Sequence, residues 1–150
     1  MAESAKDKNA KAQNYFLYAN GLYNMTYFGN ARVVKDCMYF PAYDYNNYDY
    51  KDKYTTENCD SALYYYQLAF RNAPDKEFAA RCTWMSAKCE LNNWYSSKEY
   101  TSDQINIEGE YYHQMKDNYS NTKYYAEVIN ECGYFCSFNG GGEECIRNKE

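Results

Sequence analysis

The chain has little of what a turn-rich β-protein needs, with only 2 prolines and 7 glycines among 150 residues. Because these two residues punctuate most turns, their scarcity favours helices over many short strands. No apolar run approaches the roughly 20 residues that cross a bilayer. The opening stretch, MAESAKDKNAKAQN, is polar and contains no apolar leader segment. We therefore expect a soluble helical protein with no membrane span.

Clusters of basic residues are also missing. The 16 Lys and Arg side chains are outnumbered by 21 Asp and Glu, which gives a net charge of -5 and argues against a nucleic-acid partner. The chain contains no serine nucleophile elbow, phosphate-binding loop or HExxH motif. His113 is the single histidine, so a Cys/His-dependent enzyme would need it beside a cysteine. We predict a non-catalytic protein without a cofactor and keep that enzyme as an alternative.

The 7 cysteines lie at positions 37, 59, 82, 89, 132, 136 and 145. An odd number leaves at least one thiol unpaired within the chain. Cys132, Cys136 and Cys145 could join His113 around a zinc ion, but their spacing matches no zinc module, so we predict no metal site. We interpret the cysteines as small buried hydrophobes, with one or more disulfides as the alternative.

Tyrosine is abundant, with 21 copies against 7 phenylalanines. Its ring is apolar and its tip is polar, so it suits half-buried core positions and contact surfaces. We interpret most tyrosines as replacements for leucine in the core and at its margin. The segment 41–56, PAYDYNNYDYKDKYTT, predicts a surface loop, with a small hairpin as the alternative. Its candidate contact residues are Tyr43, Tyr45, Tyr48 and Tyr50.

Apolar residues at spacings of three and four predict an all-α protein. The expected helices, about six in antiparallel hairpins, cover 8–28, 31–40, 59–73, 76–95, 105–119 and 124–135. Pro74 ends one helix, Asp75 caps the next, and the turn at 120–123 caps the last. We expect a polar start at 1–7, a single domain at 8–136 with the 41–56 loop inserted, and a mobile tail at 137–150.

The stretch ALYYYQLAFRNAP, residues 62–74, carries a small, aromatic, small, proline pattern at Ala62, Tyr66, Ala69 and Pro74. This pattern resembles the second helix of a tetratricopeptide repeat (TPR). Residues 111–125 resemble a unit common in TPR-like regions of bacterial envelope proteins, with Ser120 in place of the usual proline. The matching positions there are Tyr112, Met115, Tyr119, Thr122 and Tyr125. Ala19 and Ala31 match the two small positions of a further repeat, with Gly29 near the turn.

The resemblance implies a short right-handed solenoid of helical hairpins. The first-helix Trp-Leu-Gly-Tyr signature is absent as a set, and the 41–56 loop stands where a partner helix is expected. An irregular helical bundle therefore remains the alternative.

Solenoids of this kind bind a protein or peptide on a concave face lined by their first helices, here 10–28, 77–93 and 122–135. The residues expected on that face are Asn20, Asn24, Tyr27, Arg81, Trp84 and Lys88. Arg81, Trp84 and Lys88 share one stripe, and two basic groups beside an aromatic ring suit an acidic or carboxylate-ended peptide. The alternative is that Trp84 packs in the core and Lys88 is solvated. We predict a binding or scaffolding module.

The run Tyr15-Phe16-Leu17-Tyr18 makes the first helix apolar on more than one side. This predicts a self-associating face or contact with an upstream unit of the same chain. A second interpretation is therefore the C-terminal assembly domain of a larger exported bacterial protein. Unpaired thiols favour the cytoplasm, whereas the composition and the resemblance favour an exported, periplasmic or cell-envelope origin, to which we give slight preference.

Overall fold

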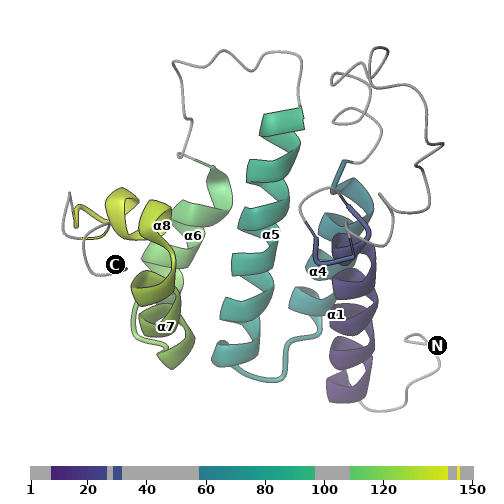
Figure 1. Ribbon diagram of the computed structural model, residues 1–150. Helices are drawn as coiled ribbons and strands as arrows, with labels where there is room; N and C mark the ends of the chain where they lie inside the picture. The colour runs from purple at the N-terminus through teal and green to yellow at the C-terminus, as the bar shows by residue number, and fades with distance from the viewer. Residues whose placement is uncertain (1–7, 27–28, 32–57, 97–108, 142–144, 146–150) are drawn as a thin grey trace, which may run out of the picture.

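The computed structural model describes residues 8–26, 29–31, 58–96, 109–141 and 145, which form six helices and no strand. The helices are α1 (Lys8–Asn24), α4 (Asp60–Arg71), α5 (Lys76–Ser96), α6 (Glu110–Tyr119), α7 (Lys123–Glu131) and α8 (Gly133–Phe138). The predicted all-α class is confirmed. Helix α5 stands in the middle, with α1 and α4 on one side and α6, α7 and α8 on the other (Figure 1).

Several predicted features lie outside the described residues. They are the polar start at 1–7, residues 27–28 of the first helix, residues 32–40 of the 31–40 helix, the 41–56 loop, residues 105–108 of the 105–119 helix, and residues 142–144 and 146–150 of the tail.

The repeat-like stretch forms α4 and the turn that follows it. Ala62 and Ala69 are at most 1% exposed, so the backbone of α4 approaches its neighbours closely, and the Tyr66 ring between them is completely buried. Helix α4 packs against both α1 and α5. Pro74 follows the end of the helix, and the Asp75 carboxylate accepts a hydrogen bond from the Phe78 amide at 2.7 Å. The predicted stop and cap are both confirmed.

Helix α5 also caps three of its neighbours. The first amides of a helix have no intrahelical acceptor, so they need partners from elsewhere. The Glu77 carboxylate accepts hydrogen bonds from the first two amides of α7 at 2.8 and 3.1 Å, and Glu90 accepts from the first two of α6 at 3.1 and 3.2 Å. Asn93 Oδ1 accepts from the Cys59 amide, which precedes α4, at 2.6 Å. One helix thus fixes where three others begin.

The core lies on both sides of α5. Between α5 and the α1–α4 pair, the buried residues are small or aromatic, namely Ala12, Tyr15, Ala19, Cys59, Ala62, Tyr66, Ala69, Phe78, Cys82 and Cys89. On the other side the Trp84 ring stacks on Tyr112, with centroids 5.8 Å apart, and meets Phe135 edge-on at 5.3 Å. Large rings pack against small side chains in both layers, and none of the buried residues that the structure describes is a leucine.

Several tyrosine hydroxyls inside the molecule are paired with side-chain amides. Four such pairs join distant residues at 2.5 to 3.0 Å, namely Tyr66–Asn20, Tyr111–Gln67, Tyr23–Asn92 and Tyr125–Asn139. A half-buried hydroxyl needs a partner to offset its lost hydration, and the amides supply it. Asparagine and glutamine are therefore part of the packing of this tyrosine-rich core.

The last predicted helix, 124–135, is in fact two helices. Cys132 adopts an extended backbone conformation, with φ -109° and ψ 104°, and separates α7 from α8. Gly133, which disfavours a continuous helix, follows directly. The break turns Phe135 inward against Trp84, Tyr112 and Tyr125. Helical structure reaches Phe138, two residues beyond the expected domain end, and Cys145 is tied back to Cys136 by a disulfide.

The Tyr66–Asn20 pair gives a first prediction. We expect Tyr66→Phe to lower the free energy of unfolding by about 1–2 kcal/mol, because Asn20 loses its buried partner. Asn20→Ala should cost a similar amount, and the double variant less than the sum of the two. Urea unfolding of the four proteins measures this coupling. Strictly additive losses would contradict an energetic role for the hydrogen bond.

The Glu77 cap gives a prediction about pH. The hydrogen bonds from the Lys123 and Tyr124 amides lower the pKa of the Glu77 carboxyl. Its contribution is therefore present above the unfolded pKa of about 4.3 and is lost as the pH falls through the folded value. We expect Glu77→Gln, which keeps the acceptor but not the charge, to be less stable than the wild type at neutral pH. The difference should vanish in acid.

Urea unfolding of both proteins across the acid range measures the effect. Glu127→Gln is the control, because this exposed carboxylate lies in the middle of α7. A stability difference for Glu77→Gln that stays constant with pH would be inconsistent with a charged cap.

Candidate functional site

The stripe of predicted contact residues on α5 divides between surface and core. Arg81 is exposed, and its guanidinium lies 5.6 Å from the centre of the Tyr124 ring. The Lys88 ammonium lies 5.8 Å from the centre of the Trp84 ring, so these two residues share one face of α5 as predicted. Trp84 itself is only 5% exposed, so its ring is packed in the core. Arg81 and Lys88 are the members of the stripe that reach solvent.

The predicted contact residues on α1 have local roles. Asn20 accepts the hydroxyl of Tyr66 at 2.7 Å, and the Asn24 side chain accepts from the Asn30 amide at 3.5 Å in the turn after α1. Tyr27 and the loop residues Tyr43, Tyr45, Tyr48 and Tyr50 lie outside the described residues. The described part therefore does not bring the predicted set together as one surface.

A different set of aromatic side chains gathers at the α1–α4 edge. Tyr18 and Tyr64 are 54% and 56% exposed, and each contacts the ring of Tyr65, with centroids 4.5 and 5.2 Å apart. We call these three residues the tyrosine edge. The consecutive aromatics at 15–18 and 64–66 were the sequence signal for it, because a run longer than one helical stripe must leave some rings in solvent.

Helix α1, which carries Tyr18, exposes apolar and neutral polar side chains and contains basic but no acidic residues. Leu17 and Met25 are 64% and 55% exposed. Helix α1 contains no acidic residue, whereas Lys8 and Lys11 stand in its first turns. The Lys11 ammonium lies 5.9 Å from the Tyr15 ring. The chain has a net charge of -5, but α1, one of the two helices that form this edge, carries no acidic side chain.

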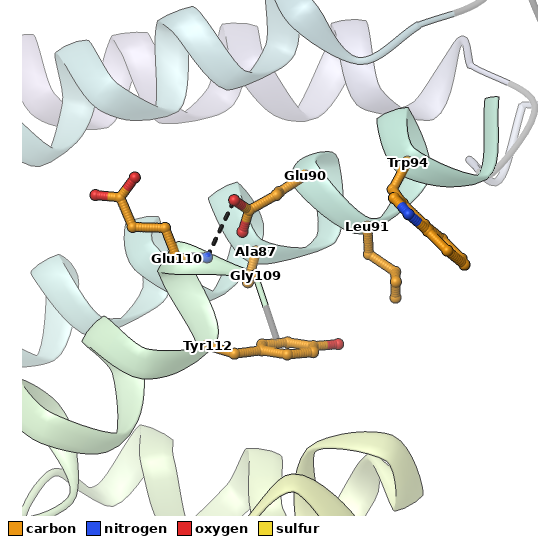
Figure 2. Close-up of a pocket in the computed structure, with 7 residues that line it drawn as sticks. All are labelled: Ala87, Glu90, Leu91, Trp94, Gly109, Glu110 and Tyr112. Carbon is orange, nitrogen blue, oxygen red and sulfur yellow. Dashed lines mark hydrogen bonds between the residues drawn. The ribbon is translucent and has the colours of Figure 1, made fainter. Parts of the chain in front are cut away.

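A small cavity of about 200 Å³ lies between α5 and the start of α6 (Figure 2). Its lining residues are Ala87, Glu90, Leu91, Trp94, Gly109, Glu110 and Tyr112. Glu90 is the one carboxylate from α5, and its oxygens already accept the Glu110 and Tyr111 amides. Burial raises the pKa of Tyr112, which keeps that hydroxyl neutral at ordinary pH. The cavity walls are polar and apolar in similar measure, and both lining carboxylates already accept hydrogen bonds, Glu90 from the α6 amides and Glu110 from the Gln114 side chain.

The candidate residues for chemistry lie apart from this cavity. The His113 ring packs edge-on against Phe138, with centroids 4.9 Å apart. Cys136 and Cys145 form a disulfide, so neither sulfur is a thiolate for zinc. Within the described ranges, no three His, Cys, Asp or Glu side chains gather as metal ligands. Cys59, Cys82 and Cys89 are buried thiols, and Cys132 is a half-buried one.

Any functional assignment rests on these residues, because comparisons with known proteins found no match. No protein-family model, no curated protein and no solved structure matches the chain. In the part of the chain that the structure describes, no helix combines the length and the apolar character needed to cross a membrane.

Gly109 gives a prediction for the α5–α6 contact. A Cβ built there would overlap the Glu90 carboxylate, while the backbone φ of -64° suits alanine. We expect Gly109→Ala to lower the free energy of unfolding by about 1–3 kcal/mol, because Glu90 must leave the amides of α6. Gly21→Ala is the control, since its Cβ meets open space within α1 and should stabilise by about 0.5–1 kcal/mol. Thermal or urea unfolding that moves both variants in the same direction would contradict this assignment.

Proposed function

We propose that this chain is a non-catalytic module that binds a protein or peptide partner, with the tyrosine edge as its contact surface. The observation that carries the proposal is the continuous row of Tyr18, Tyr65 and Tyr64 rings, the outer two more than half exposed. Single exposed apolar residues are common on proteins, whereas contiguous exposed rings are typical of contact sites.

The chemistry of tyrosine supports a contact role. Its rigid ring buries a large area with little loss of side-chain entropy, and its hydroxyl remains hydrogen-bonded at a wet rim. Tyrosine is accordingly enriched among the residues that contribute most to binding energy. Helix α1 carries Lys8 and Lys11 and no acidic residue, which favours a partner surface with acidic side chains.

The packing is consistent with a TPR-like arrangement, which we propose for the helical array. The two small residues and the aromatic of α4 are buried, as close pairing of repeat helices requires. The α1–α4 pair lies at one edge of the array, where a further unit or a partner would pack (Figure 1). The Cys136–Cys145 disulfide supports an exported origin, because such bonds persist in oxidising compartments.

Site-specific photocrosslinking in the native host tests this proposal. The photoreactive benzoylphenylalanine replaces Tyr18 or Tyr64 in separate proteins, which keeps an aromatic ring at each position. We expect the same partner to be captured at both positions, since the two rings belong to one surface. An adduct with the mass of two copies would identify the partner as a second copy of this chain.

The matched control carries the same group at Asp117, an exposed position of α6 away from the tyrosine edge. Equal capture at Asp117 would show non-specific contact and would overturn the assignment of the surface. Failure of both tyrosine positions, in proteins whose circular dichroism matches the wild type, would overturn it as well.

A further inference from the structure

Two buried cysteines meet where α4 begins beside α5. Cys59 immediately precedes α4, Cys89 lies on α5, and the two are 1% and 0% exposed. Both belong to one packed cluster with Ala19, Ala62 and Tyr66. The two thiols therefore lie in the same packed cluster between α4 and α5, and each is the largest influence on the pKa of the other. Neither is part of the Cys136–Cys145 disulfide.

The surroundings hold Cys59 in a fixed orientation. Asn93 accepts its amide at 2.6 Å and, through its own amide nitrogen, donates to Asp60 at 2.7 Å. The Asn92 amide nitrogen lies 3.8 Å from the Cys59 sulfur, and the Thr26 hydroxyl lies 3.9 Å from it. Cys89, Asn92 and Asn93 are spaced by three and four residues, so they share one face of α5. This face therefore contacts both the backbone and the thiol of Cys59.

The same contacts make the two thiols chemically unequal. The hydrogen bond from Cys89, followed in weight by contacts with Thr26 and Asn92, lowers the pKa of Cys59 to about 7 despite its burial. The same hydrogen bond and burial raise the pKa of Cys89. A position at a helix N-terminus also favours a thiolate. Cys59 is thus the better nucleophile of the pair, and Cys89 is the neighbouring thiol.

Cys82 shows what an ordinary buried cysteine looks like in this protein. It lies on the same helix as Cys89 and is equally buried, but its cluster is Ala12, Tyr15, Ala69 and Phe78. No thiol or amide lies among those residues, and burial raises the pKa of Cys82 to about 12. The polar contacts at Cys59 are therefore specific to that position.

We propose that Cys59 and Cys89 are a redox-active pair that forms a reversible disulfide between the start of α4 and the middle of α5. This inference is independent of the proposed partner surface. The oxidant is a small-molecule disulfide such as oxidised glutathione. Because the first turn of a helix opens more easily than its middle, Cys59 is the sulfur that the oxidant reaches.

The reaction is two successive thiol–disulfide exchanges. The Cys59 thiolate attacks one sulfur of the small disulfide, whose S–S bond breaks and releases one small thiolate. Cys89 then loses its proton and attacks the Cys59 sulfur of the mixed disulfide, which expels the second small thiol. Two electrons pass from the protein to the oxidant, and one S–S bond replaces another. The protein gains a covalent link between α4 and α5.

Peptide mapping of the wild-type protein tests the proposal directly. The folded chain is equilibrated in glutathione buffers of rising oxidised fraction, quenched in acid, alkylated and digested with trypsin without reduction. Cleavage after lysine and arginine places Cys59 in 54–71, Cys82 in 82–88 and Cys89 in 89–98. We expect 54–71 linked to 89–98, with Cys82 alkylated, and full reversal by dithiothreitol. The linked protein should melt on the order of 10 °C higher.

Single variants separate the roles of the two sulfurs. Cys89→Ser should trap the intermediate as a glutathione adduct on Cys59, whereas Cys59→Ser should leave Cys89 unmodified. Cys82→Ser should form the 54–71 to 89–98 link as the wild type does. If the wild-type link is absent in oxidising buffer, or if glutathione accumulates on Cys89 instead of Cys59, the proposal is overturned. The wild-type map decides the pairing even where a variant fails to fold.

Discussion

The arrangement of this protein depends on hydrogen bonds that side chains of helix α5 accept from backbone amides at the starts of neighbouring helices. Glu77, Glu90 and Asn93 each accept from the first amides of a different helix, or from the residue just before it. These contacts set the position of each helix along α5, which apolar packing alone would leave free to slide. The burial of rings and alanines then fixes the distance between helices. The place of Cys59 beside α5 follows from the bond to Asn93.

Tyrosine in the core introduces hydroxyl groups that need hydrogen-bond partners. A ring in place of leucine brings a hydroxyl into the region between helices, and that hydroxyl must keep a partner. Side-chain amides from another helix or from its capping residue provide it, for example Asn20 for Tyr66 and Asn139 for Tyr125. Tyr18 and Tyr64 instead turn their rings to solvent. One residue type therefore builds both the interior and the exposed edge.

Local signals predicted the helices well. The all-α class, the stop at Pro74, the cap by Asp75 and the cap within the 120–123 turn, which Thr122 provides, could be read from the sequence, because each depends on residues a few positions apart. The caps by Glu77 and Glu90 could not, since their partners lie 46 and 20 residues away and any exposed glutamate looks alike in sequence. The break at Cys132 was missed because it depends on Phe135 finding a place against Trp84. The repeat type remains a prediction.

The candidate site was harder to predict for a related reason. Spacing placed Arg81, Trp84 and Lys88 on one stripe, but only packing decides which of them faces the interior. Equally, nothing local to Cys59 indicates that Asn92 will lie against its sulfur or that Cys89 will share its cluster. Contacts between distant segments assemble both features.

The pairing of tyrosine hydroxyls with amides also bears on how such a sequence can diverge. A substitution at either member of a pair leaves the other without its hydrogen-bond partner. A single substitution therefore lowers stability more than a double substitution that replaces both members. Positions such as 20 and 66, or 23 and 92, are therefore expected to covary in homologous sequences, moving together between a Tyr–Asn pair and an apolar pair. Drift of this kind alters the identity of many core positions while the backbone stays the same. A helical fold of this kind can therefore be retained after the sequence similarity that identifies related proteins has been lost.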